Sequence, residues 1–190
     1  MNISNEKTAL LVIDVQRGFN APSWGRRDTP QAESNISKIL KIFRNSELAI
    51  YHVQHLSQSP DSPLRASQPG VDFMDFAQPI LGERIFQKHV NSAFIGTHLE
   101  EVLRNDEIQS LVIVGISVDH CVSTTARMAA NLGFSVFVIS DATIAFERKG
   151  FDGVSYSAEL VHSVTLASLH GEFATVLSTS ALLDILGTAK

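Results

Sequence analysis

The sequence predicts an α/β protein in which a parallel six-stranded sheet lies between two layers of helices. The run 108–114 is short, continuously apolar and rich in β-branched residues, which is typical of a strand buried on both faces, and five further short runs are expected to form strands. Segments with apolar residues at helical spacing separate these runs, and such alternation favours parallel strands joined by right-handed crossovers. The sequence therefore predicts a three-layer α/β/α domain. Its expected strands are residues 8–13, 48–53, 84–88, 108–114, 134–140 and 173–177.

Helix-start signals accompany the apolar periodicity between these strands. Thr29 and Pro30 fit the N-cap and first turn of one helix, and Thr97 with Glu100 fits a capping box at the start of another. Three further helices are expected after the fourth, fifth and sixth strands. They cover residues 122–132, residues 158–169 with Leu160, Val161, Val164 and Ala167 on the inner face, and a final segment from Ser178 or Thr179 to Ile185.

The single cysteine lies where the fourth strand gives way to a helix. Asp119 fits the N-cap of that helix, so Cys121 would fall in its first turn. Unpaired backbone N–H groups and the positive end of the helix dipole stabilise a thiolate there and can bind an oxyanion. A lone cysteine is more often a small buried apolar residue. A catalytic role therefore needs support from other parts of the chain.

Two charged residues provide that support at the carboxyl ends of other strands. Asp14 follows the first strand, and Lys88 ends the third. Ligands bind beyond the carboxyl ends of strands in open α/β sheets, so we expect Asp14, Lys88 and Cys121 to meet there. A carboxylate can take a thiol proton, and an ammonium group favours the ionised forms of both neighbours. The simpler alternatives are that Asp14 caps a turn and that Lys88 is solvated.

Length and composition limit the possible functions. A chain of 190 residues fits one domain, residues 1–190. A net charge of −5 without a basic cluster argues against a nucleic-acid partner. The sequence has neither an apolar run of membrane-spanning length nor the pattern of a signal peptide, so no membrane partner is expected. One free cysteine suits a reducing compartment, and we expect a cytoplasmic protein.

Three motifs occur in order along the chain. They are Leu11-Val12-Ile13-Asp14-Val15-Gln16-x-x-Phe19, Lys88-x-x-x-Ser92-Ala93-Phe94-x-x-Thr97-x-Leu99 and Gly115-Ile116-x-x-Asp119-x-Cys121-Val122-x-x-Thr125-Ala126. Together they resemble the isochorismatase-like cysteine hydrolases, a family that includes nicotinamidases, N-carbamoylsarcosine amidase and biuret hydrolases. The resemblance implies a catalytic triad, a sheet of order 3-2-1-4-5-6, a cis peptide bond and an oxyanion hole. The triad would be Asp14, Lys88 and Cys121, the cis bond would join Ile116 to Ser117, and the backbone N–H groups of Ser117 and Cys121 would form the oxyanion hole.

The resemblance also implies a reaction. The cysteine favours hydrolysis of a small-molecule C–N bond, of amide, ureide or carbamoyl type, through a thioester. Isochorismatases proper cleave a vinyl ether and lack the cysteine, so vinyl ether hydrolysis is the second possibility. A non-catalytic member that uses the fold for ligand binding or assembly is the third. The resemblance also suggests a homo-oligomer, either a dimer or a tetramer.

Metal and substrate contacts are less clearly marked. Nicotinamidases of this type carry an Asp-x-His metal motif after the second strand, where this chain has only His52 and His55. A spacing of three places these residues on opposite faces of a strand. We therefore predict no cofactor and no catalytic metal, with a structural or pocket-lining role for both histidines; a weak metal site that uses His55 is the alternative.

Substrate contacts are expected from aromatic and basic residues near the strand ends. Aromatic side chains are more often plain core, and an arginine is as readily solvated as bound to a substrate carboxylate. The long polar segment 57–70 is expected to form a loop, and long loops often act as lids. The candidates for substrate contact are Phe19, Trp24, Phe94, Ile116 and Arg65, with Arg148 as a further possibility; His162 and His170 are expected at the surface or an interface.

Overall fold

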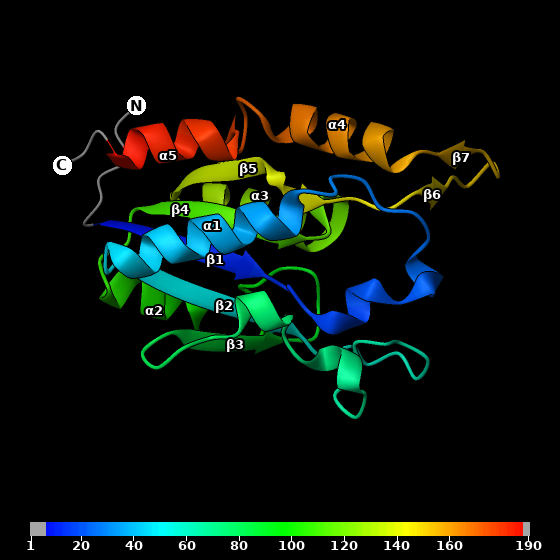
Figure 1. Cartoon of the computed structure of the whole chain (residues 1–190), viewed down its shortest axis with the longest axis horizontal. Helices are drawn as coiled ribbons and strands as arrows, with labels where there is room; N and C mark the ends of the chain where they lie inside the picture. Colours follow the sequence, from blue (N-terminus) through cyan, green and yellow to red (C-terminus); the bar gives the residue numbers. More distant parts are fainter. Residues whose placement is uncertain (1–6, 188–190) are drawn as a thin grey trace.

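A computed structural model describes residues 7–187 of the chain, and its centre is a six-stranded parallel sheet (Figure 1). The order β3-β2-β1-β4-β5-β8 confirms the predicted sheet, with β8 as its sixth strand. Residues forming β4 and β1 are buried throughout, as expected for central strands with helices on both faces. The strands are β1 (Thr8–Ile13), β2 (Ala49–His55), β3 (Arg84–Lys88), β4 (Ser110–Ile116), β5 (Ser135–Ile144) and β8 (Thr175–Leu177).

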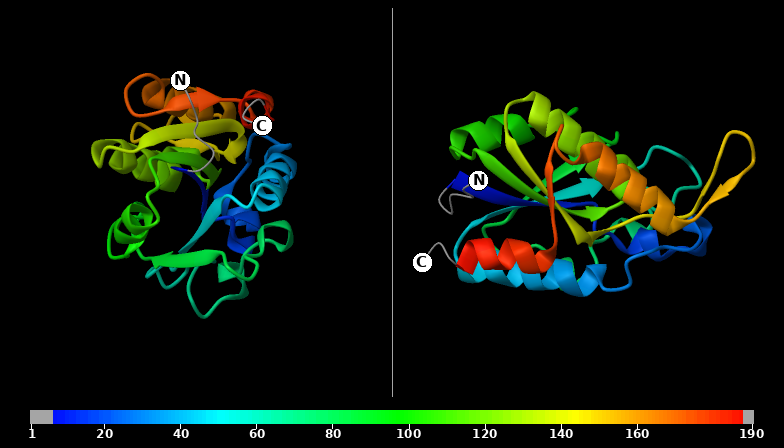
Figure 2. Two further views of the ribbon diagram at one scale, coloured as in Figure 1. Left: turned by 90° about the vertical axis from the view of Figure 1, so that its left-hand side faces the viewer. Right: turned by 90° about the horizontal axis from the view of Figure 1, so that it is seen from above.

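Helices cover both faces of this sheet (Figure 2). Helices α1 (Ala32–Asn45) and α5 (Thr179–Gly187) pack on one face, while α2 (Leu99–Asn105), α3 (Ser123–Asn131) and α4 (Ala158–Leu169) lie on the other. Alternate residues of each strand supply the two core layers, because successive side chains in a strand point to opposite faces. In β1, Leu10 and Val12 belong to the α1 layer, and Ala9, Leu11 and Ile13 belong to the other.

The turn into α3 differs from the expected N-cap. Val118–Val122 form a π-helical turn, η6, directly before α3, and Ser117 rather than Asp119 precedes it. Cys121 therefore lies inside the π-helical turn, close to the end of β4. The expected capping box is also incomplete: α2 starts after His98, and Thr97 Oγ1 accepts a hydrogen bond from Leu99 N at 3.3 Å.

The fifth strand and its continuation are longer than the sequence indicated. β5 extends past Asp141 because a register shift between Ile113 and Gly115 of β4 lets its second half pair again with the end of β4. A short antiparallel hairpin follows, formed by β6 (Arg148–Lys149) and β7 (Ser155–Tyr156). Two-residue strands leave no detectable periodicity, so the sequence did not predict this hairpin.

Helix α4 is oriented differently from the expectation. Leu160 and Val164 were expected inside but are 48% and 59% exposed. The buried residues of α4 are Ala158 and Leu169, at its two ends, and the helix packs against α3 and the η6 turn. It thus lies over neighbouring helical elements near one edge of the sheet and leaves one side uncovered (Figures 1 and 2).

Short 3-10 helices connect the strands at the end of the sheet that carries Asp14. They include η2 (Arg17–Asn20) and η3 (Pro22–Trp24) after β1, and η4 (Pro69–Val71) and η5 (Asp75–Ala77) before β3. The polar loop expected as a lid packs on η2 of its own chain through η4 and buries Leu64. Among residues 7–187, no helix is both long and apolar enough to cross a membrane.

Candidate active site

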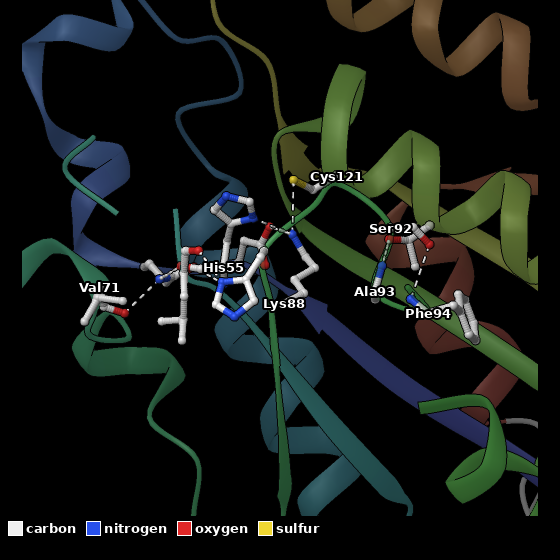
Figure 3. A network of polar contacts seen from close by, with 12 residues as sticks. His55, Val71, Lys88, Ser92, Ala93, Phe94 and Cys121 are labelled. Atoms are coloured by element: carbon white, nitrogen blue, oxygen red, sulfur yellow. Dashed lines mark hydrogen bonds and ion pairs between the residues drawn. The ribbon is translucent and has the colours of Figure 1, made fainter. Parts of the chain in front are cut away.

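Three side chains predicted to meet at the carboxyl ends of the strands do so. Lys88 Nζ lies 2.6 Å from Asp14 Oδ2 and 3.3 Å from Cys121 Sγ. Asp14 and Lys88 are at most 1% exposed, and Cys121 is 7% exposed. Figure 3 shows the ammonium group of Lys88 directed at the sulfur. The structure therefore places a carboxylate, an ammonium and a thiol in direct contact in a site shielded from solvent.

The sheet order explains how Lys88 reaches the other two residues. β3 is separated from β1 by β2, so its backbone lies about 9.6 Å away, or two strand spacings. Lys88 pairs in register with His55, the last residue of β2. Its long side chain crosses β2 at that point and brings the ammonium group back over the end of β1. A shorter cationic side chain at this position would not span the distance.

Asp14 is held at the end of β1 by an unusual backbone conformation. Its φ is 52°, in the left-handed region that few residues other than glycine adopt and that aspartate tolerates better than most. Its N–H donates to Val53 O at 3.0 Å, which keeps it attached to β2. One carboxylate oxygen, Oδ2, accepts from Lys88, whereas the buried Oδ1 has no hydrogen-bond partner among the residues described. A proton acceptor thus remains available beside the thiol.

Burial controls the protonation of this cluster. It raises the pKa of Asp14, and the Lys88 ammonium opposes that effect. Burial, together with the nearby Asp14 carboxylate, also raises the pKa of the Cys121 thiol, again against the effect of Lys88. One ammonium can balance one negative charge. The site is therefore suited to hold a single negative charge that moves between Asp14 and Cys121 when one proton passes between them.

His55 is a fourth member of the cluster. Its Nδ1 lies 3.1 Å from Lys88 Nζ, and Figure 3 shows its ring beside the ammonium group. Burial, assisted by the positive charge of Lys88, lowers the pKa of His55 to about 4. The ring is therefore neutral near pH 7 and can accept a hydrogen bond from the ammonium. The sequence indicated a pocket-lining role for His55 but not this contact with Lys88, because the pairing of β2 with β3 creates it.

Gln16 fixes the position of His55. Its fully buried side chain accepts from His55 N at 2.8 Å and donates to His55 O at 3.0 Å and Val71 O at 2.8 Å. These bonds join the segment after β1 to the end of β2 and to η4. Gln16 belonged to the first sequence motif, but its spacing alone did not reveal a partner 39 residues away.

The segment after Lys88 is tied to the helix that follows the cysteine. Ala93 N donates to Thr125 Oγ1 at 3.1 Å, and Thr97 Oγ1 donates to Ala93 O at 2.6 Å. Ala93 and Thr125 are both buried. These bonds connect the second and third sequence motifs, so Lys88 and Cys121 are positioned relative to each other by their own flanking residues.

The same cluster offers donor atoms of the kinds that metals accept. Asp14, His55 and Cys121 each present one ligand atom, and these three atoms lie within 4.8 Å of one another. Imidazole, thiolate and carboxylate are common zinc ligands. However, Lys88 Nζ lies within 3.3 Å of an atom of each residue. The ammonium thus already supplies a positive charge to all three groups, and a metal at this position would have to displace it.

The proposed oxyanion-hole residues are the cysteine itself and a serine shortly before it in the chain. The peptide bond between Ile116 and Ser117 is cis, and Ser117 and Cys121 are both buried. Ser117 directly precedes the η6 segment, and Cys121 lies inside it. Their backbone N–H groups thus belong to the turn that carries the sulfur, the usual place for oxyanion donors.

Asp119 and Arg148 form a second polar contact beside Cys121. Arg148 Nε donates to Asp119 Oδ2 at 2.8 Å, and Arg148 Nη2 lies 3.5 Å from His120 Nδ1. Burial opposes ionisation of Asp119, but hydrogen bonds from Arg148 and Ser117 outweigh it and lower the pKa of this carboxyl. Arg148, considered as a substrate anchor from the sequence, is thus engaged by its own chain and ties the β6–β7 hairpin to the η6 turn.

The aromatic residues expected to contact substrate pack mainly against other aromatic rings. Phe19 is buried and packs against Trp24 and Phe146, with ring centroids 5.0 and 6.1 Å away. Trp24 also lines a cleft of about 300 Å³ together with Arg148. Phe94 stacks on Phe134 at 6.2 Å, and Figure 3 shows its ring directed away from Cys121. The loop after Lys88 turns this ring into the core, so the structure does not bring Phe94 to the sulfur.

The other two expected substrate contacts are also not at the thiol. The side chain of Ile116 is fully buried in the core layer of α1, because β4 ends there between two neighbouring strands. Arg65 is exposed and bonds within its own loop, to Pro60 O at 3.5 Å. The loop packs on η2, so the guanidinium remains in solvent.

Two further histidines have structural contacts. His52 is fully buried, with Nε2 2.7 Å from Glu83 Oε2, which supports the structural role predicted for it. His162 was expected at the surface or at an interface, but its ring lies inside the chain between Asp28 Oδ2 at 3.4 Å and Thr143 Oγ1 at 3.1 Å. It connects α4 to β5 and is mostly buried. His170 is exposed as expected and accepts a hydrogen bond from Val176 N.

Comparison with known proteins identifies relatives over nearly the whole chain. The family model described as the isochorismatase domain matches residues 8–181. The isochorismatase family protein YrdC of Bacillus subtilis, whose function is uncharacterised, is 44% identical over 94% of this chain and 96% of its own. Nicotinamidase 3 of Arabidopsis thaliana is 26% identical over 92% of this chain and 86% of its own. A crystal structure of an isochorismatase-family protein from Chromobacterium violaceum has a TM-score of 0.95 and 39% identity, with 99% of this chain and 97% of that one covered.

Proposed function

Because this chain belongs to the isochorismatase family, whose members include hydrolases, we propose that it is a cysteine-dependent hydrolase of a small-molecule C–N bond. The bond would be of amide, ureide or carbamoyl type. The observation that carries the proposal is the contact of Lys88 with both Asp14 and Cys121 in a buried site. A family member that is a nicotinamidase, and therefore acts on an amide, supports this choice of bond.

In the proposed first step, Asp14 takes the thiol proton of Cys121, and the sulfur attacks the carbonyl carbon of the substrate. The buried Asp14 Oδ1 has no hydrogen-bond partner among the residues described and can accept this proton. Lys88 compensates the negative charge before and after the transfer, so the site never holds two negative charges. The backbone N–H groups of Ser117 and Cys121 stabilise the oxyanion of the tetrahedral intermediate.

In the second half of the reaction, the C–N bond breaks and the leaving nitrogen takes the proton from Asp14, which leaves a thioester on Cys121. Water then attacks the thioester, and Asp14 accepts a proton from that water. The thioester C–S bond breaks, the product acid departs, and the proton returns to the sulfur. Acid and base roles thus alternate on one carboxyl group.

The first experiment measures ammonia or amine release from a panel of small amides, ureides and carbamoyl compounds. We expect Cys121→Ala to remove turnover of any substrate found, while Arg65→Ala, a variant of an exposed residue in its own loop, retains it. Turnover by Cys121→Ala at the parent rate would show that the sulfur is not the nucleophile. Pyruvate release from isochorismate, without activity on the C–N compounds, would instead favour the vinyl ether reaction.

A second experiment separates an enzyme from a non-catalytic binder. Iodoacetamide should modify the single thiol once per chain, and an aldehyde analogue of an accepted amide should protect it by forming a reversible adduct with the sulfur. In Lys88→Met, alkylation at neutral pH should slow at least about tenfold, because the ammonium no longer favours the thiolate. A thiol that is inert in the wild-type protein would favour the binder.

A further inference from the structure

Lys88 and Cys121 bring an amine nitrogen and a thiol into contact without a covalent bond between them. Lys88 Nζ lies 3.3 Å from Cys121 Sγ, and Figure 3 shows the ammonium group directed at the sulfur. Cys121 is the single cysteine of the chain, so oxidation cannot close a disulfide within it. The amine of Lys88 is instead the group that an oxidised sulfur would meet.

The burial of the sulfur limits which partners can reach it. Cys121 is 7% exposed, and Lys88 is 1% exposed. A small peroxide can enter such a site, whereas the thiol of another folded protein would require the surrounding turn to open. Sulfenic acid, the first product of thiol oxidation, condenses with a nearby thiol or with a nitrogen. Because the chain has no second thiol, the structure provides a nitrogen.

We propose that hydrogen peroxide converts this contact into a reversible sulfenamide, a covalent bond between Cys121 Sγ and Lys88 Nζ. In the first step, Asp14 takes the thiol proton, and the sulfur attacks one oxygen of the peroxide. The O–O bond breaks, and the departing hydroxide takes the proton from Asp14 and leaves as water. The sulfur is thereby oxidised to sulfenic acid, and the peroxide is reduced.

The second step needs the amine in its neutral form, and Asp14 is placed to produce it. Asp14 Oδ2 lies 2.6 Å from Lys88 Nζ and can take a proton from the ammonium group. Burial, which raises the pKa of Asp14, favours this transfer because it removes two charges at once. The free amine then attacks the sulfur, the S–O bond breaks, and the hydroxide leaves as water with the proton from Asp14.

His55 provides a place for the last proton. The nitrogen of the new bond must lose one proton, and His55 Nδ1 lies 3.1 Å from Lys88 Nζ. The ring is neutral near pH 7, because burial and the positive charge of Lys88 lower its pKa to about 4. The second of these causes disappears when the lysine nitrogen becomes neutral. The site then holds one carboxylate and one imidazolium, so its net charge is the same as that of the original ion pair.

The bond would also protect the sulfur from further oxidation. Sulfenic acid oxidises to sulfinic acid, which thiols do not reduce, whereas a thiol can reopen a sulfenamide by attacking its sulfur. The inference concerns only the oxidation chemistry of Cys121 and Lys88. It therefore does not depend on the proposed hydrolysis, and its test measures mass rather than turnover.

Mass spectrometry of the full chain after treatment with hydrogen peroxide tests the inference. Loss of two hydrogens should lower the mass by about 2 Da, whereas sulfenic and sulfinic acids raise it by about 16 and about 32 Da. Dithiothreitol should restore the original mass. Proteolysis without reduction should give one cross-linked pair of peptides, one with Lys88 and the other with Cys121. An internal disulfide cannot produce this loss, because the chain has one cysteine.

Variants show whether the lysine is the partner. Lys88→Met keeps the thiol but lacks the amine, so its mass should only rise, by about 16 and then about 32 Da. Circular dichroism establishes that it is folded. Should it not fold, Asp14→Asn/Lys88→Met replaces it, because that variant leaves neither charge buried alone. Lys38→Met, which removes an exposed amine on α1 at the other face of the sheet, should behave like the wild type.

Three results would overturn the inference. One is a wild-type thiol that peroxide leaves unchanged, and another is a wild-type thiol that passes only to the heavier acids. The third is a lowered mass that persists in the folded variant without Lys88, because the sulfur would then have bonded to a different nitrogen. Each result is read from the mass of the chain, so a protein that hydrolyses no tested C–N compound would still give a decisive answer.

Discussion

Lys88 and Asp14 form an ion pair with fully buried side chains, 2.6 Å between Nζ and Oδ2, although 74 residues separate them in sequence. A buried pair of this kind gains little net stability, because both charges lose hydration. Loss of one partner is far more costly, because the other charge then remains buried alone. Substitution of Lys88 or Asp14 alone should therefore destabilise the protein more than substitution of both.

Replacing Lys88 by methionine should lower the free energy of unfolding by about 3–5 kcal/mol at pH 7, since the Asp14 carboxylate loses its counter-ion. The double variant Asp14→Asn/Lys88→Met should recover a large part of that loss, because the asparagine is neutral. Urea unfolding of the wild type, Asp14→Asn, Lys88→Met and the double variant measures both effects. Costs that simply add in the double variant would show that the two charges do not depend on each other.

His55 should make stability depend on pH. Its pKa is about 4 in the folded protein, against 6.5 for an unperturbed histidine. The unfolded chain therefore binds more protons between these values, so stability is complete above about pH 6.5 and declines as the pH falls toward 4, by roughly 2 kcal/mol from this residue. Below pH 4 both states are protonated, and the decline from His55 ends.

The variant His55→Gln should show a shallower decline in unfolding free energy between pH 6.5 and 4, measured by urea titration at half-unit steps. Glutamine can still accept a hydrogen bond from Lys88 but does not titrate. His52, whose pKa burial also lowers, contributes equally to both proteins. His98→Gln is the control, because its side chain is 88% exposed. Parallel curves for wild type and His55→Gln would contradict the prediction.

Arg148→Met should destabilise the protein by about 1–3 kcal/mol at pH 7, because Asp119 loses its charged donor while remaining largely buried. Arg148 helps lower the pKa of Asp119, so its contribution is present while this carboxyl is ionised and is lost as the pH falls through that lowered pKa. Urea unfolding at pH 7 and pH 3 measures the difference. Arg17→Met removes an ion pair whose two side chains are 49% and 88% exposed, so it should cost much less than Arg148→Met. Equal costs for the two variants would contradict this account.

Gly115→Ala should be among the most damaging single changes that add one methyl group. Gly115 has φ of 130°, and a Cβ there would lie 2.0 Å from Ile13 O, in the strand that leads to Asp14. We expect a loss of at least about 3 kcal/mol, since backbone must move. Gly133 also has a positive φ, of 89°, but its Cβ would meet nothing within 4 Å, so Gly133→Ala should cost only about 1 kcal/mol. Chemical unfolding of both variants tests the comparison, and similar losses would show that the conformation of the glycine, rather than the contact with β1, decides the cost.

Much of the fold could be predicted from local sequence. Buried parallel strands need nearly continuous apolar residues, so β1 and β4 were visible within two residues of their bounds. β3 was predicted at its observed bounds, although it is an edge strand in which only Phe86 and Lys88 are buried. The position of Asp14, Lys88 and Cys121 at strand ends followed from the same runs, because the carboxyl ends of parallel strands share one edge. Strand order came from the family resemblance, and the sheet confirms it.

Contacts that depend on register or on packing across the molecule were not predictable in this way. The pairing of His55 with Lys88 requires β2 and β3 to align at those two residues, and the bond between Arg148 and Asp119 requires the hairpin to fold back on η6. Which side of α4 faces solvent also depends on packing across the molecule. The residues of α4 are apolar on most sides, so helical spacing alone could not show which side faces the protein.

The sequence by itself thus determined the layers, the strands and the three residues at their ends, because hydrophobic periodicity is a local property of the chain. Only the tertiary structure decided which groups surround the thiol, how its proton is shared and which apolar side chains remain uncovered. Those features arise from distances between residues far apart in sequence, which the packing of the sheet and its helices sets.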